Sequence, residues 1–249
     1  MQATVYAVAA SHPVKATLLM LDHKGIPWKR RDLANVIDRP LLRAMGFPAA
    51  TVPAVKIDGR KIQTSRAIAR ALDELVPEPP LFPADPDRRA AVEDAERWGD
   101  EVLQPVPRRL SWNALKRDRS GLRSFVEGPI MGIPPSIAAA TAAPLIHGSA
   151  RINKATDDAV RADLMSLPAL IDQVDDLIAN GIIGGAERNA ADFQILCSVR
   201  LLLCFDDLRP LLDGRPAAEH AMRVVPDYPG RIPPVYPAEW LPAPAAASA

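Results

Sequence analysis

A proline-rich segment divides this chain into two parts with different hydrophobic patterns. The segment VPEPPLFPADPD (76–87) carries five prolines in twelve residues, and proline lacks the N–H group that a helix interior or a central strand requires. Short strand-like runs alternate with helical patterns before this segment, whereas only helical patterns follow it. The predicted organisation is a first domain over 1–76, a linker over 77–87, an all-helical domain over 88–225 and a Pro/Ala-rich tail over 226–249.

The first part is predicted to alternate strands with helices. TVYAVA (4–9) is apolar enough for a buried strand, and VKATLLMLDHKG (14–25) has the spacing of a helix that ends at Gly25. Asp58-Gly59 separates two short strand-like runs, 53–57 and 60–63, as expected for a hairpin. The other predicted elements are a strand at 28–33, a short helix around 39–46 and a helix at 65–75 capped by Thr64 or Ser65. The predicted order is β-α-β-α-β-β-α.

The second part is predicted to consist of helices around one very apolar segment. Residues 189–205 are the most apolar helical stretch, which is typical of a helix buried on every side. Asn189 and Asp192 at its start form a variant of the capping box, with Asp in place of Glu. The flanking predictions are a helix at 88–115 that bends near Pro105 and Pro107, a helical run at 157–181 that is interrupted at Pro168, and a short helix around 216–225. A Pro-rich coil follows, and the tail from about 242 is expected to be disordered.

Composition argues against several classes of partner. Thirty basic and thirty acidic residues give a formal net charge of zero, without the basic excess that phosphate-backbone binding needs. The segment 129–146 comes closest to a membrane span, but its prolines and its lack of flanking aromatic residues argue against one. Residues 1–11 lack a basic region, so they favour a first strand over a signal peptide. We therefore expect a soluble cytoplasmic protein that binds neither nucleic acid nor membrane.

The cysteines and histidines do not indicate a metal site. Cys197 and Cys204 are seven residues apart in an apolar stretch, which favours two buried small hydrophobic side chains over a disulfide or a metal knuckle. The four histidines show no metal-ligand spacing. His12 is expected to be solvated at an exposed helix start, and we assign it no role.

Three segments together resemble cytosolic glutathione S-transferases of the serine type. They are the strand-to-helix junction at Ser11, the segment TVPAVKIDGR (51–60) and the segment QTSRAIARALDEL (63–75). The resemblance extends to about residue 225. It implies an α/β thioredoxin-like N-terminal domain followed by an all-α helical-bundle C-terminal domain, glutathione as co-substrate, no metal, and usually a homodimer built from the first domain of one subunit against the second domain of the other.

The resemblance also assigns site residues. The residue that carries out the thiol chemistry maps onto Ser11, and the Val-Pro step that pairs with the backbone of glutathione maps onto Val52 and Pro53, with a cis peptide bond. The serine that holds the γ-glutamyl carboxylate maps onto Ser65. Thr64 replaces the usual acidic or amide residue before it, and the insertion 128–150 is not a usual family element.

Each of these assignments has a structural alternative. Ser11 and Ser65 are also good helix caps, and Pro53 would also suit the edge of a strand. Three candidates for the substrate side of the cleft lie on the first helix of the second domain: Trp98, Arg108 and Trp112. The two tryptophans would equally suit core or dimer contacts.

Two functions therefore stay open. One is an enzyme that conjugates or processes a hydrophobic electrophile with glutathione or a related thiol. The other is a non-catalytic binding or scaffold protein that keeps the fold, which Thr64 and the insertion favour. A thiol-disulfide or dehydroascorbate reductase ranks last, because it needs a cysteine where Ser11 stands.

Overall fold

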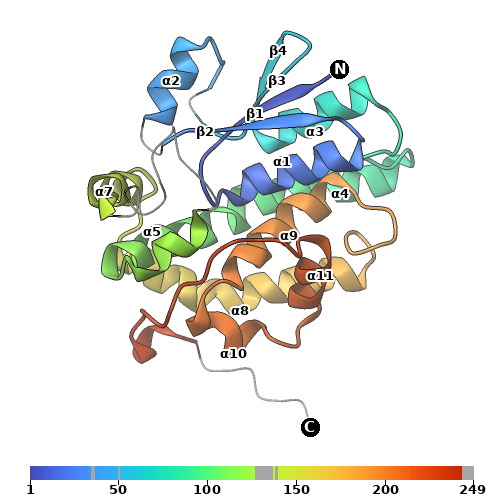
Figure 1. Ribbon diagram of the computed structural model, residues 1–249. Coiled ribbons are helices and arrows are strands. Elements are labelled where there is room, and N and C mark those ends of the chain that lie inside the picture. Colours follow the sequence, from blue (N-terminus) through green and yellow to red (C-terminus); the bar gives the residue numbers. More distant parts are fainter. Residues whose placement is uncertain (35–36, 50, 127–136, 138–139, 243–249) are drawn as a thin grey trace.

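The computed structural model describes residues 1–34, 37–49, 51–126, 137 and 140–242 (Figure 1). Its first part contains a four-stranded mixed sheet in the order β2-β1-β3-β4. The central strand β1 pairs in parallel with β2 and antiparallel with β3, and β3 forms a hairpin with β4 through Asp58 and Gly59, as predicted. The strands are β1 (Ala3–Ala7), β2 (Trp28–Asp32), β3 (Ala54–Ile57) and β4 (Arg60–Gln63).

Helices cover both faces of this sheet. The helices α1 (His12–His23) and α3 (Ser65–Leu75) lie between the sheet and the helical second part (Figure 1). The short helix α2 (Asp38–Ala44) covers the other face, where the ring of Phe47 meets the ring of Tyr6 from β1 at 5.4 Å between centroids. This β-α-β-α-β-β-α order is the predicted thioredoxin-like arrangement.

The second part is all helical in the residues that the structure describes. It begins with one long helical path, in which a π-helical turn at Gly99–Leu103 separates α4 from α5. Close contact with the core helix explains a glycine there, because a Cβ at Gly99 would lie 2.7 Å from a side-chain carbon of Ile195. The helices are α4 (Pro86–Trp98), α5 (Pro105–Arg117), α7 (Ala143–Ile152), α8 (Asp157–Ala179), α9 (Ala190–Leu202), α10 (Arg209–Leu212) and α11 (Pro216–Val224), with 3-10 turns at Ser120–Phe125, Asp206–Leu208 and Ala238–Trp240.

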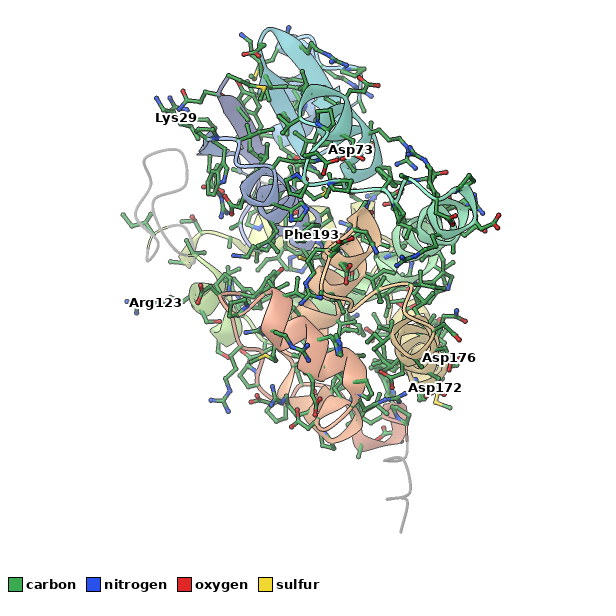
Figure 2. All side chains as sticks on the ribbon, turned by 90° about the vertical axis from the view of Figure 1, so that its right-hand side faces the viewer. Lys29, Asp73, Arg123, Asp172, Asp176 and Phe193 are labelled. Atoms are coloured by element: carbon green, nitrogen blue, oxygen red, sulfur yellow. The ribbon has the colours of Figure 1, made fainter. Side chains whose placement is uncertain are left out.

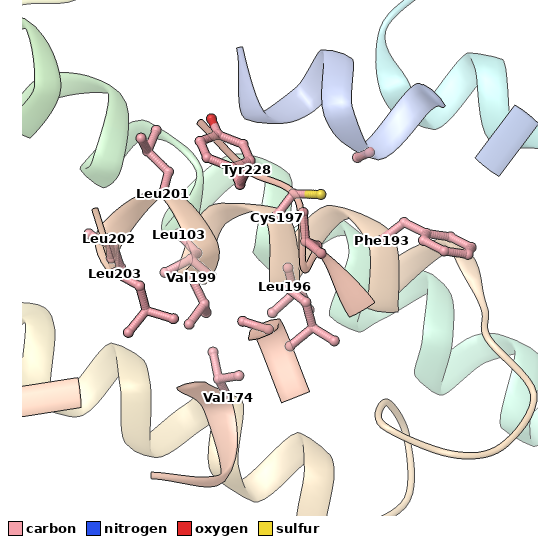
Figure 3. Packing of buried hydrophobic residues seen from close by; sticks show 14 of the residues in the cluster. Leu103, Val174, Phe193, Leu196, Cys197, Val199, Leu201, Leu202, Leu203 and Tyr228 are labelled. Carbon is pink, nitrogen blue, oxygen red and sulfur yellow. The ribbon is translucent and has the colours of Figure 1, made fainter. Parts of the chain in front are cut away.

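The helix α9 is the centre of the core, as its apolar sequence predicted. Every residue of α9 except Arg200 is buried. Figure 3 shows Val199 directed toward Val174 of α8, while Cys197 lies on the side of α1. The predicted capping box is present at its start, with Asn189 and Asp192 each accepting from the other's backbone N–H. Both cysteines are free and buried.

The proline-rich segment is tied to the first part by two charged side chains. Buried Lys24 contacts Asp73 of α3 at 2.5 Å and donates to the carbonyl oxygens of Val76 and Pro79 at 2.7 and 2.6 Å. Asp73, labelled in Figure 2, also accepts from the backbone N–H of Leu81 at 2.8 Å. The two parts therefore share one continuous core beneath this segment.

Pro168 lies inside the helix α8. The predicted interruption at Pro168 is wrong, because α8 runs through it. Its buried neighbours Leu164, Leu167 and Ile171 pack in the core, and this packing outweighs the missing N–H. The segment after α11 is mostly coil, as predicted, apart from the 3-10 turn at Ala238–Trp240. It packs on the helices, since the Tyr236 hydroxyl donates to the Leu110 carbonyl at 2.7 Å. The predicted disordered tail lies outside the described residues. No described helix is long and apolar enough to cross a membrane.

Candidate functional site

A cavity of about 620 Å³ lies between the first part and the helical part. The β1–α1 loop, the segment before β3 and the start of α3 border it on one side, and α5 and α7 border it on the other. Its volume falls in the usual range for small-molecule sites. The described end of the insertion contributes to this cavity, because residues between Thr141 and Ser149 line it.

Ser11 lies at the edge of the cavity, immediately before α1. Its backbone is extended (φ −73°, ψ 109°), which is typical of an N-cap residue, yet its side chain accepts no capping hydrogen bond. The residue is half-buried and lines the cavity. The hydroxyl is therefore available to a ligand, and a helix N-terminus favours negative charge at this place.

The segment before β3 faces the same cavity. The Val52–Pro53 peptide bond is cis, as predicted, and both residues line the cavity. Gln63 holds this segment from β4, because its side-chain N–H donates to the Thr51 carbonyl at 2.8 Å and its oxygen accepts from the backbone N–H of Ala49. The buried side chain of Gln63 thus supports the backbone before β3, a role that no pattern in the sequence indicated.

The start of α3 divides capping and cavity lining between two adjacent residues. The Thr64 hydroxyl accepts from the backbone N–H of Ala67 at 3.3 Å, so Thr64 is the cap. The structure describes no hydrogen bond of the Ser65 hydroxyl, and Ser65 is buried at the cavity wall. Ser65 therefore does not act as the cap in this structure.

The opposite wall is one face of the α4–α5 path. Asp100, Gln104, Arg108 and Trp112 follow at intervals of four residues and all line the cavity, as residues spaced in this way share a helix face. Trp98 does not belong to the cavity lining; it is half-buried and packs against the main core. Of the three substrate-site candidates, the structure brings Arg108 and Trp112 to the cavity.

His12 departs from the expectation of a solvated ring. Only 3% of it is exposed, and its Nε2 atom has no hydrogen-bond partner among the described residues. Burial lowers the pKa of His12 well below its usual value and nearby Arg108 lowers it further, against a smaller opposite effect of the Gln104 carbonyl. The imidazole is therefore neutral at neutral pH. The expectation failed because the ring lies beside Gln104 and Arg108 from the opposite wall of the cavity.

The C-terminal segment reaches the same loop from 218 residues away. The Tyr228 hydroxyl donates to the Ala10 carbonyl at 2.6 Å, directly before Ser11. Ala10 has a positive φ of 54°, which is uncommon for a residue with a side chain. Burial raises the pKa of Tyr228 well above its usual value, so its hydroxyl remains a donor. No local pattern in the Pro-rich sequence indicated this contact.

The carboxylates and cations of the cavity do not form a metal site in the described part of the chain. No group of three or more metal-ligating side chains is found there. Burial raises the pKa of Asp100, and burial lowers the pKa of Arg108. The arrangement offers instead a hydroxyl at a helix start, a peptide backbone edge and a largely apolar wall.

The first part matches a known family over most of its length. Residues 5–80 match the family model for the glutathione S-transferase N-terminal domain. This match places the first part of the chain with the N-terminal domains of the glutathione S-transferase superfamily. A curated relative, glutathione S-transferase DHAR2 from Arabidopsis thaliana, is 41% identical over 64 residues, which make up 26% of this chain and 30% of that protein. The chain therefore matches less than a third of the length of that relative.

Solved structures of this superfamily extend the likeness in fold to both parts. A glutathione S-transferase from Sinorhizobium meliloti 1021 superposes with a TM-score of 0.62 at 16% identity, covering 96% of each chain. A glutathione S-transferase from Rhodospirillum rubrum F11 superposes with a TM-score of 0.58 at 19% identity, covering 91% of this chain and 89% of the other. At these identities the likeness concerns the fold.

Proposed function

We propose that this protein is a glutathione transferase-like enzyme that joins glutathione, or a related low-molecular-weight thiol, to a hydrophobic electrophile. The observation that supports this most directly is the Ser11 hydroxyl, which lies at the start of α1, lines the cavity and makes no capping bond. A hydroxyl in that position can donate to a sulfur, and a hydrogen bond to a charged acceptor is stronger than a neutral one.

The chemistry requires a thiolate. A free thiol has a pKa of about 8.5, and a helix N-terminus with a nearby donor lowers it. In the proposed reaction the thiol proton leaves to solvent, the thiolate sulfur forms a bond to the electrophilic carbon, and a leaving group departs with the bonding electron pair. Holding both reactants in one cavity supplies the rest of the acceleration.

Val52, Pro53, Thr64 and Ser65 would bind the glutathione peptide. The Val52 backbone is proposed to pair with the cysteinyl unit, and Ser65 with the γ-glutamyl carboxylate. The free N–H groups in the first turn of α3 would add to the attraction for that carboxylate. Trp112 and the apolar residues near α7 would face the second substrate, whereas Trp98 is dropped from this role because it lies outside the cavity lining and packs against the main core.

A homodimer and a cytoplasmic location are further parts of the proposal. The homodimer rests on the resemblance to the superfamily, and the cytoplasmic location rests on the sequence of residues 1–11 and 129–146. Light scattering at micromolar concentration should give the mass of two chains. A monomer at that concentration would contradict the dimer without affecting the proposed chemistry.

Isothermal calorimetry with glutathione tests the thiol site without knowledge of the second substrate. We expect saturable binding to the wild-type protein, weaker binding to Ser65→Ala, and unchanged binding to Ser120→Ala, which replaces an exposed serine outside the cavity lining. Absence of binding to the wild-type protein would favour the alternative function, a non-catalytic scaffold with this fold.

A further inference from the structure

The cavity wall contains an arginine whose charge is not neutralised by a direct ion pair. Arg108 lines the cavity, and no carboxylate of the described residues forms an ion pair with it. Its Nη2 donates to the side-chain oxygen of Gln104, and Gln104 in turn donates to Asp100 at 3.2 Å. A neutral amide thus stands between this guanidinium and the nearest acidic group on its own helix.

Arg109, the next residue on α5, has a structural role and provides a comparison with Arg108. Arg109 binds Asp163 of α8 through two hydrogen bonds, at 2.6 and 2.5 Å. These bonds raise the pKa of Arg109, whereas burial lowers the pKa of Arg108. Arg109 therefore joins two helices, and Arg108 has no comparable partner.

Other groups around Arg108 do not compensate its charge. Arg39 of α2 also lines the cavity and acts on Arg108 as a like charge, as does Arg109. His12 is buried beside it and neutral. Asp100 is the carboxylate that acts on Arg108, through the intervening Gln104. A half-buried cation that has no direct ion pair is costly unless a ligand brings negative charge.

Apolar side chains continue the wall immediately beyond Arg108. Trp112 and Leu115 follow at intervals of four and three residues on the same face of α5. Leu122, Phe125 and Ile146 border the same cavity. A ligand that lies along this wall would meet an apolar surface with one guanidinium at its end, and a guanidinium binds carboxylates through two parallel hydrogen bonds.

We propose that the second ligand of this cavity is an apolar, aromatic-sized molecule with one carboxylate, which Arg108 binds while Trp112 and Leu115 contact its body. This inference rests on the proposed function for the thiol side of the same cavity. It names the class of molecule that the transferase would act on. Neutral hydrophobic compounds of the same shape would bind more weakly.

A matched pair of probes tests this inference directly. Biphenyl-4-carboxylate and biphenyl-4-carboxamide have nearly the same shape and differ in charge. Their affinities are measured by calorimetry with glutathione present at saturation, so that neither probe competes for the thiol site. We expect the wild-type protein to bind the carboxylate roughly tenfold to a hundredfold more tightly, as for hydrogen bonds to a charged group.

Two variants test whether Arg108 causes the preference for the carboxylate probe. Arg108→Gln should bind both probes with equal affinity, and its folding is checked by circular dichroism. Lys116→Gln is the control, because it removes a positive charge from the exposed side of the same helix outside this cavity; it should keep the wild-type preference. Equal affinities in the wild-type protein, or a preference that survives in Arg108→Gln, would overturn the inference.

The two proposals fail in different ways. If the wild-type protein binds no glutathione, the probes are measured without it, and a carboxylate preference that depends on Arg108 still supports the inference while the proposed function fails. If glutathione binds and the two probes bind equally, the inference fails and the proposed function stands.

Discussion

The helices α1 and α9 pack against each other in one core, but their starts differ sharply in side-chain capping. At the start of α9, Asn189 accepts from the backbone N–H of Ala191 and of Asp192 at 3.0 and 3.1 Å, and Asp192 accepts from the N–H of Asn189 and of Gly184 at 2.9 and 2.7 Å. At the start of α1, the side chain of Ser11 makes no such bond.

The difference concerns what faces each helix start. The first N–H groups of any helix lack partners within the helix, so side chains, water or ligands must satisfy them. The start of α9 is buried in protein, and its own side chains satisfy these groups. The start of α1 opens on the cavity, where a ligand can take that role. One helix start thus serves folding, and the other is available for binding.

The largest expected effect on stability is at the start of α9. Asp192→Ala should lower the free energy of unfolding by about 3–5 kcal/mol, because it removes a buried carboxylate, leaves the half-buried N–H groups of Asn189 and Gly184 without this partner and removes the charge opposite Arg188. Urea unfolding measures the loss. Asp158→Ala, in the exposed first turn of α8, is the control and should lose much less. Equal losses in the two variants would contradict this prediction.

At the start of α1, a substitution should change activity far more than stability. Ser11→Ala removes no capping bond, so stability should stay within about 0.5 kcal/mol of wild type. Turnover of a generic aromatic electrophile should fall by roughly tenfold to a thousandfold, as for loss of one donor to a developing charge. The pKa of bound thiol should rise toward its free value, which ultraviolet titration measures.

The control for this variant is Ser120→Ala, which should change neither quantity. If Ser11→Ala shows the same thiol pKa and the same rate as wild type, Ser11 is not the donor. The scaffold function would then be the better explanation of the fold.

Buried His12 at the same helix start should make stability depend on pH. Its folded pKa is lowered, so between that value and the unfolded value of about 6.5 the unfolded chain binds more protons. Stability therefore falls as the pH drops below about 6.5, by at most about 1.4 kcal/mol per pH unit for this group. His12→Asn should show a shallower loss of melting temperature between pH 7 and pH 5.

His147→Asn is the control for this effect, because His147 is exposed. It should keep the wild-type dependence on pH. The melting temperature of His12→Asn should still depend weakly on pH, since burial lowers the pKa of His23 too. An unchanged slope in His12→Asn would show that protonation of His12 does not limit stability in acid.

The smallest expected effect is at the start of α3. This start has a capping side chain, like the start of α9, and a residue that faces the cavity, like the start of α1. Thr64 caps this helix with a φ of 71°, while Ser65 faces the cavity. Thr64→Ala should lose about 0.5–2 kcal/mol. Thr64→Gly should lose less, because glycine adopts a positive φ without strain. Thermal unfolding compares the two variants; an Ala variant at least as stable as the Gly variant would contradict the prediction.

The sequence by itself determined the features that depend on neighbours along the chain. The hairpin at Asp58-Gly59, the capping box at Asn189 and the order of elements in the first part all follow from turn residues, caps and hydrophobic period. The cis bond at Val52–Pro53 was predicted as well, through the resemblance to the superfamily.

Only the tertiary structure decided which of these residues meet. Packing between distant segments determines the burial of His12 and the contact from Tyr228 to Ala10. It also determines that Trp112 lines the cavity and that Trp98 packs against the main core. Local sequence patterns specify backbone conformation within a few residues, because caps and turns act over that range. Which residues surround a helix start depends on elements far away in the chain, such as Gln104 and Arg108 beside His12.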